Sequence, residues 1–144
     1  MVKESYILAA KLNPWIKRVA WGSDAESLIC STEFVVLNPI ERGYKAFLYE
    51  MANQNSFVNY CTTVSTGTSH SQRRVNPEVM KMYQLPFDKD VCLAFSKVVE
   101  PIIKKQIDNI QDIKALQSQR DELLPLLMNS QVSVKQLNSD LSHD

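Results

Sequence analysis

The sequence predicts an α+β protein in which a small β-sheet with short helices precedes one long C-terminal helix. Before residue 88, short apolar and β-branched runs alternate with turn-forming pairs such as Asn13-Pro14 and Asn38-Pro39, a pattern typical of strands. After Asp88, apolar residues recur every three or four positions, the spacing of one helix face. With 144 residues, 44% of them hydrophobic, the chain can form one such domain with a projecting element.

Three segments are predicted to be strands because they are short, apolar and bounded by turn residues. They are YILAAKL at 6–12, KRVAW at 17–21 and LICSTEFVVLNP at 28–39. These strands form the predicted sheet.

Short helices are predicted to follow the strands. YKAFLYEMANQ at 44–54 places its large apolar side chains on one side at helical spacing, and SFVNYCTTV at 56–64 is a second candidate. NPEVMKMYQLP at 76–86 is expected to form one helical turn with Pro77 at its first position, and then a short strand that Pro86 ends.

The long helix has a clear start signal. Asp88 is well placed as an N-cap, with Asp90 in the first turn. At 1.5 Å per residue the helix would be roughly 55 to 60 Å long, too long for the small domain to cover its apolar stripe. We expect Pro101 to bend or restart it and Pro125 to kink it near its end.

The apolar stripe therefore predicts a partner helix, and since no second long amphipathic helix exists in the sequence, the simplest partner is a second copy. We expect an antiparallel homodimer paired as a coiled coil. Arg120 interrupts the stripe and is expected to meet Asp108 or Asp112 of the partner, because an unpaired guanidinium in the seam would be costly. The predicted seam consists of Ile103, Ile107, Ile110, Ile113, Leu116, Arg120, Leu123 and Leu127.

Composition excludes several classes of protein. The formal net charge is zero, so any binding of nucleic acid must come from a local patch. Cys30, Cys61 and Cys92 form no C-x-x-C pair and lack histidines at ligand spacing, which argues for three buried thiols in a reducing cytosol. No apolar run approaches the roughly 20 residues that span a bilayer, and we expect a soluble, cytoplasmic protein without a membrane partner.

Two polar segments are the candidate functional sites. Arginine offers a bidentate fork to guanine or phosphate, glutamine and asparagine can pair with adenine, and hydroxyl groups donate to phosphate oxygens. Both segments could equally be ordinary solvated loops. The candidate DNA-binding residues are Thr66, Gly67, Ser69, His70, Gln72, Arg73 and Arg74 in TGTSHSQRRVNP, and Lys11, Asn13, Trp15, Lys17 and Arg18 in KLNPWIKR.

The same segments carry no recognisable catalytic motif. His70 has serine neighbours, but residues adjacent in sequence point in different directions, and no carboxylate partner can be assigned. The chain lacks G-x-S-x-G, Walker, G-x-G-x-x-G and paired Cys/His motifs. We therefore expect no catalytic residue, no metal site and no cofactor.

Four elements, in order, resemble the specificity subunit of type I restriction-modification enzymes. ILAAKLNPWIKRVAW is similar to the family's strand-turn-strand around K-x-x-P, and ICSTEFVVLNP to its C-S-x-x-F-x-V-L-x-P strand. GTSHSQRRVNPEVMKMYQLP follows, and IKALQSQRDELLPLLMNSQVSV resembles the end of the family's spacer helix. Together they cover about residues 6 to 134.

The resemblance implies a non-catalytic DNA-binding subunit. In this family each target-recognition domain recognises one half of a split DNA site, and paired helices act as a ruler that fixes the gap between the halves. Methyltransferase subunits dock against the helices, and restriction subunits join the assembly. By this resemblance residues 1–88 are a partial target-recognition domain, 89–130 the dimerisation and spacer helix, and 131–144 a flexible tail.

One departure leaves an alternative open. The family's recognition domain runs about twice as far before ILAAKLNP, so the chain is expected to begin inside that domain. The alternative hypothesis is a truncated fragment that keeps only the helical surface and acts as a protein-protein interaction element.

Overall fold

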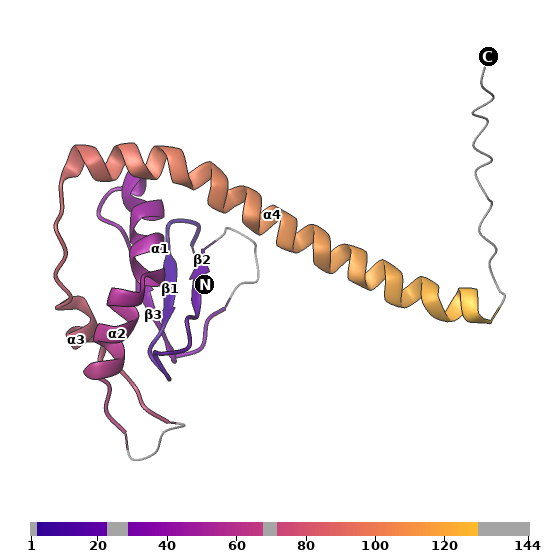
Figure 1. The fold of residues 1–144 in the computed structure, drawn as a ribbon, viewed down its shortest axis with the longest axis horizontal. Coiled ribbons are helices and arrows are strands. Elements are labelled where there is room, and N and C mark those ends of the chain that lie inside the picture. Colours follow the sequence, from indigo (N-terminus) through magenta and orange to yellow (C-terminus); the bar gives the residue numbers. More distant parts are fainter. Residues whose placement is uncertain (1–2, 23–28, 68–71, 130–144) are drawn as a thin grey trace. The chain divides into compact units, whose positions relative to one another are not determined.

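The computed structural model describes residues 3–22, 29–67 and 72–129 and has an α+β fold, as predicted. Its contacts form two compact units, residues 1–103 and 104–144. The first unit contains a three-stranded sheet, short helices and the start of the long helix (Figure 1). The elements are β1 (Ile7–Ala10), β2 (Val19–Trp21), β3 (Phe34–Leu37), a 3-10 turn η1 (Arg42–Tyr44), α1 (Lys45–Asn53), α2 (Asn55–Thr63), α3 (Pro77–Lys81) and α4 (Lys89–Met128).

The sheet is antiparallel, with β1 between β2 and β3. Ile7 lies opposite both Trp21 and Leu37. β3 is much shorter than the predicted strand at 28–39, because the chain turns just before it: the Phe34 N–H donates to the Ser31 carbonyl at 3.1 Å. This turn is why the strand begins only at Phe34.

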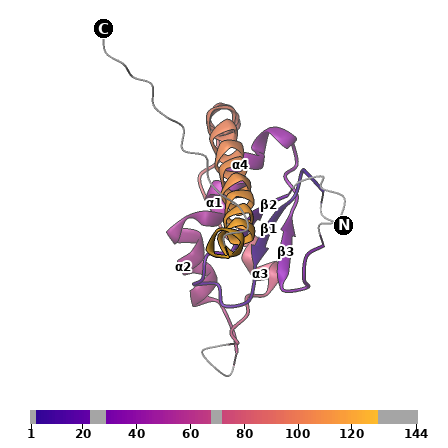
Figure 2. The same cartoon turned by 90° about the vertical axis from the view of Figure 1, so that its right-hand side faces the viewer.

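The core of the first unit lies between the sheet and the short helices. Figure 2 shows α1 and α2 on one side of the sheet. Both predicted helices are confirmed, and each end differs from the prediction by one residue. Burying a large apolar side chain contributes about 1.5 to 3 kcal/mol, so the cluster of buried side chains in this core holds the unit together. Its buried members are Ala9, Val35, Met51, Ala52, Phe57, Cys61, Val75 and Met80.

The segment after α2 is partly as predicted. Pro77 occupies the first turn of α3, and the Asn76 carboxamide caps it by accepting from the Glu78 N–H at 2.9 Å. The strand predicted to end at Pro86 is wrong, since no described residue between α3 and α4 belongs to a strand. Tyr83 instead packs its ring on Phe57 at 5.2 Å, so single side chains anchor this segment to the core.

The long helix α4 begins as predicted and runs without interruption. The Asp88 carboxylate accepts from the Val91 N–H at 2.9 Å, which caps the first turn. The helix does not restart at Pro101, because α4 continues through both prolines, while the expected bend at Pro101 and kink at Pro125 stay predictions. Proline removes one N–H, here the donor to the Lys97 carbonyl, and the flanking turns retain the helix.

The first stretch of α4 packs into the first unit. Cys92, Ser96 and Ile103 are all buried there, with Ile103 only 2% exposed. Ser96 also accepts a hydrogen bond from the Phe47 N–H of α1 at 3.1 Å. The prediction that Ile103 belongs to a dimer seam is therefore wrong, because its side chain is already covered within its own chain.

In the second unit, the described residues 104–129 consist almost wholly of helix, and the apolar side chains face solvent. Ile110 and Leu116 are 53% and 63% exposed, and only Ile107 is half-buried. Arg120 lies with its Nη2 2.7 Å from Oδ1 of its sequence neighbour Asp121, and its pairing with Asp108 or Asp112 of a partner stays a prediction. The coiled-coil pairing and the homodimer remain predictions.

The three cysteines are free thiols. Cys61 and Cys92 are buried as expected, but Cys30 is partly exposed, so the prediction of three buried thiols is wrong for that residue. It lies before β3, in the segment that does not join the sheet.

Candidate nucleic-acid interface

The two polar segments singled out in the sequence meet at one end of the sheet. The chain after β1 pairs with the chain after the 66–74 loop: the Asn13 N–H donates to the Arg73 carbonyl at 2.8 Å, and the Val75 N–H to the Lys11 carbonyl at 3.0 Å. Leu12 and Arg74 form an antiparallel bridge. Backbone pairing therefore joins residues that lie about sixty positions apart in sequence.

The 66–74 loop is closed at its neck by two backbone hydrogen bonds. The Thr66 N–H donates to the Arg74 carbonyl at 2.9 Å, and the Arg74 N–H donates to the Thr66 carbonyl at 2.8 Å. Gly67 follows with φ of 154°, and a Cβ there would lie 2.8 Å from the Gln72 carbonyl oxygen. Gly67 is thus required by the close approach of the two sides of the loop. The predicted residues Ser69 and His70 lie outside the described residues.

The first segment forms a tight turn that presents Trp15. Asn13 has φ of 49°, a left-handed conformation that asparagine tolerates better than most residues. The Ile16 N–H donates to the Asn13 carbonyl at 2.9 Å and closes the turn. Trp15 is 36% exposed beside the backbone junction.

The three arginines of the site bond to their own chain. Arg18 donates to the Leu12 carbonyl at 2.6 Å, and Arg73 to the Ser65 carbonyl at 2.7 Å. Arg74 makes a fork to the Glu33 carboxylate, with its Nε 3.0 Å from one oxygen and its Nη2 3.2 Å from the other. These bonds fix the guanidinium groups at this end of the sheet.

Glu33 is the member of the site that sequence reasoning missed. Its carbonyl accepts from the Lys11 N–H at 2.9 Å, and its carboxylate pairs with Arg74. The hydrogen bond from Arg74 holds the pKa of Glu33 below its usual range, and the same bond raises the pKa of Arg74. Since Glu33 precedes β3 and is remote in sequence, no local pattern could have revealed it. Its negative charge offsets one arginine of the patch.

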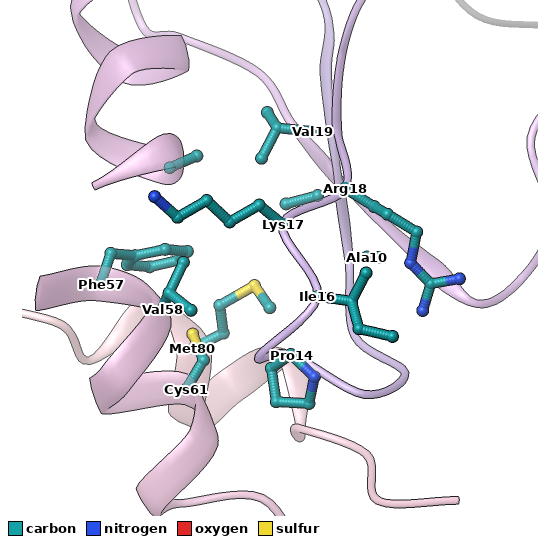
Figure 3. A pocket seen from close by; sticks show the side chains of 12 residues that line it. Ala10, Pro14, Ile16, Lys17, Arg18, Val19, Phe57, Val58, Cys61 and Met80 are labelled. Atoms are coloured by element: carbon teal, nitrogen blue, oxygen red, sulfur yellow. The ribbon is translucent and has the colours of Figure 1, made fainter. Parts of the chain in front are cut away.

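The side chains of Lys17 and Arg18 lie on different sides of the backbone. Figure 3 shows the Lys17 side chain directed over the hollow toward the helices, while Arg18 points to the opposite side. This hollow has a volume of about 20 Å³, enough for a single water, so it is no ligand site. The structure therefore gathers Lys11, Asn13, Arg18, Thr66, Arg73 and Arg74 around one junction, but not the Lys17 amine. The Gln72 backbone lies in the adjoining loop, against Gly67.

The described residues hold no group of three or more histidine, cysteine or acidic side chains placed to bind a metal ion. Burial raises the pKa of the Cys61 thiol to about 11, so this cysteine is a core residue with little thiolate at neutral pH. None of the described helices is both long and apolar enough to span a membrane.

Comparison with known proteins gives no information on this site, so its chemistry is inferred from its own residues. No family model, no curated protein and no solved structure matches this chain.

Proposed function

We propose that this chain is a DNA sequence-recognition subunit of a type I restriction-modification complex, without catalytic activity of its own. The observation that carries the proposal is the backbone junction of Lys11–Asn13 with Arg73–Val75. It draws two polar segments into one patch that carries arginine forks, amides and a hydroxyl group. These are the groups that contact base edges and phosphates.

The geometry of the arginines supports recognition rather than simple charge attraction. A guanidinium that bonds to its own backbone through one nitrogen keeps further N–H donors in a fixed direction. Arg18 and Arg73 are held in this way. The chain has no net charge, so binding depends on a few fixed donors, and its salt dependence is set by the number of phosphates that these donors contact.

The proposal includes partners that the helix would serve. The exposed apolar side chains of residues 104–128 support a homodimer through α4, with the two helices antiparallel as a spacer. Methyltransferase subunits dock against this spacer, and the restriction subunit joins through the complex. Each chain then recognises one half of a two-part DNA site.

Selection from a random duplex library, with a salt titration of the recovered sites, tests the DNA-binding part. We expect a recurrent half-site whose affinity exceeds that for scrambled duplex by orders of magnitude. Enrichment of no sequence, with binding equal on all duplexes, would contradict sequence recognition. Purified alone, the chain should neither cleave DNA nor transfer a methyl group from S-adenosylmethionine.

Glu33 offers a sharper test than removal of an arginine. Glu33→Gln keeps the side-chain shape but releases the Arg74 guanidinium from its ion pair. We expect tighter binding and a salt slope steeper by about one phosphate contact. Glu41→Gln, which removes the same charge from the exposed pair with Lys89, is the matched control.

Truncation of the arginines completes this test. Arg73→Ala and Arg74→Ala should each weaken cognate binding by about 1 to 3 kcal/mol, with lost base preference for a guanine contact and uniform weakening for a phosphate contact. Lys17→Ala is expected to change mainly the salt slope, and less than Arg18→Ala, because Lys17 points toward the helices. Unchanged binding in every variant would exclude this patch.

A second candidate function follows from the exposed helix alone. If the patch is an ordinary solvated surface, the exposed stripe of residues 104–128 still supports a fragment that acts as a helical interaction element. The DNA selection described above distinguishes the two functions, since the second predicts self-association without any preference for a DNA sequence.

A further inference from the structure

The sheet has an open edge along β3. Hydrogen-bonding direction alternates along an antiparallel strand, and the Lys11 N–H donates to the Glu33 carbonyl across the β1–β3 pair. Val35 and Leu37 therefore bond toward β1 like Glu33. The intervening Val36 must direct its N–H and its carbonyl away from β1.

The neighbouring backbone groups extend this edge. The Phe34 carbonyl and the Asn38 N–H point the same way as those of Val36, while the Phe34 N–H is used in the turn to Ser31. In the described part of the chain β3 pairs with β1 alone, on the opposite side. An incoming strand would thus find a donor and an acceptor on Val36 and one further group on each side.

The hydrophobic core is open beside the same edge. A groove of about 420 Å³ runs along it, and its floor includes core residues. A second hollow of about 280 Å³ continues from it, sharing Asn38 and Leu48. The helices α1–α3 therefore extend the core beyond the last strand. The groove is lined by Leu37, Leu48, Met51, Phe57, Met80 and Tyr83.

The surroundings of the groove are apolar. Val36 is 43% exposed, Phe87 59% and Ile40 100%. Among the described residues that line either hollow, Lys81 alone is charged, and it is paired with Glu78 at 2.9 Å. The edge strand itself carries no charge or proline, the usual protections of an exposed edge.

We propose that this edge binds an extended segment of a separate polypeptide, which adds to the sheet as a fourth strand beside β3. Its backbone pairs with Val36, and every second side chain, apolar and medium-sized, enters the groove over the core. Side chains of a strand alternate between faces, so the segment is apolar at alternate positions and polar between them. A compact small ligand could fill part of this apolar groove but would leave the outward N–H and carbonyl of Val36 without the partners that an added strand supplies.

The proposal does not depend on DNA binding and is tested on the full chain with a displayed library of random twelve-residue peptides. We expect enriched peptides with apolar residues at alternate positions. Synthetic copies should bind, and N-methylation at alternate residues on the side that bonds to β3 should weaken binding at least tenfold, whereas N-methylation of the intervening residues should not.

Substitutions at Val36 separate backbone pairing from side-chain contact. Proline at an edge position is tolerated and removes only the outward N–H, so Val36→Pro should fold and lose peptide binding at least tenfold. Val36→Ala keeps the N–H and should bind within about threefold of the parent, with folding of both variants checked by circular dichroism. Ile110→Asp, in the second unit, should not affect the peptide.

Three results would overturn the proposal. The first is enrichment of peptides whose apolar residues do not alternate with polar ones. The second is peptide binding that survives both N-methylation and Val36→Pro. The third is failure to enrich any peptide whose binding is weakened by Val36→Pro. Dimerisation of the chain without peptide that Val36→Pro abolishes would also overturn it, since the occupant would then be a second copy.

Discussion

The two stretches of α4 share one sequence signature and have different surroundings. Residues 89–103 bury one face of the helix, with Cys92, Ser96 and Ile103 at 3% exposure or less, while Val98 and Ile102 of the same stretch stay exposed. From Lys104 onward the same spacing of apolar residues continues, yet Ile113 and Leu123 are 54% and 51% exposed. Amphipathic periodicity shows that a helix face is suited to burial, but it does not show what buries it.

The exposed stretch also carries a change of register. Ile110, Ile113 and Leu116 are spaced by three residues each, so Leu116 lies about 120° around the helix from Ile110 at 3.6 residues per turn. A straight partner helix could not contact Ile110 and Leu123 equally well. We expect a paired helix to be overwound between Ile110 and Leu116, as at a three-residue discontinuity of a coiled coil.

The largest effect is expected at Ile103, which marks the end of the buried stretch. Ile103→Ala removes a side chain that is 2% exposed and should lower the free energy of unfolding by about 2 to 5 kcal/mol, measured by urea denaturation. Ile102→Ala, at a side chain 54% exposed, is the control and should cost about 1 kcal/mol or less. Equal effects would show that the two stretches do not differ as described.

A comparable effect on association, not stability, is expected in the exposed stretch. Ile110→Asp should raise the dimer dissociation constant at least about 100-fold, since each dimer loses two apolar contacts of about 1.5 to 3 kcal/mol. Sedimentation equilibrium of the 16.4 kDa chain measures this. The free energy of unfolding per monomer should hardly change, and a parent chain that is monomeric at micromolar concentration would remove the helix-paired dimer.

A smaller difference separates two serines of the same helix. Ser96→Ala leaves the Phe47 N–H without its acceptor in a buried site and should cost about 1 to 3 kcal/mol of unfolding free energy. Ser118 is exposed and bonds only to Glu122, so Ser118→Ala should cost about 0.5 kcal/mol or less. Thermal unfolding followed by circular dichroism compares them, and similar costs would contradict the buried role of Ser96.

The smallest effect is expected on the reaction rates of the cysteine thiols, all of which lie in the first unit. Cys30 should react with a disulfide reagent at once at pH 8, whereas Cys61, with a pKa of about 11, should react slowly. Because its folded pKa lies above the unfolded value of 9.0, Cys61 favours folding below pH 9, and this contribution is lost as the pH rises toward 11. Ile103→Ala should speed the labelling of Cys61, because it loosens the first unit, and Ile110→Asp should not. The opposite order would contradict the division of α4 at Ile103.

Local signals in the sequence were sufficient for the helices and their start positions, but not for the extent of the strands. Asp88 caps a helix and Pro77 occupies a first turn, both as predicted, because these interactions join residues within one turn of each other. The fold class followed from the change of periodicity near residue 88. The predicted strand before Pro86 failed, because strand pairing requires a neighbour that no local pattern specifies.

The site was predictable in its residue types but not in its assembly. KLNPWIKR and TGTSHSQRRVNP were evident as polar segments, whereas their junction depends on backbone bonds between residues such as Asn13 and Arg73. Glu33 entered the site only because β3 places it beside Lys11 and Arg74. Tertiary structure alone decided these partners, as it decided that Ile103 is covered and Ile110 is not, because chain segments distant in sequence meet only when the core forms.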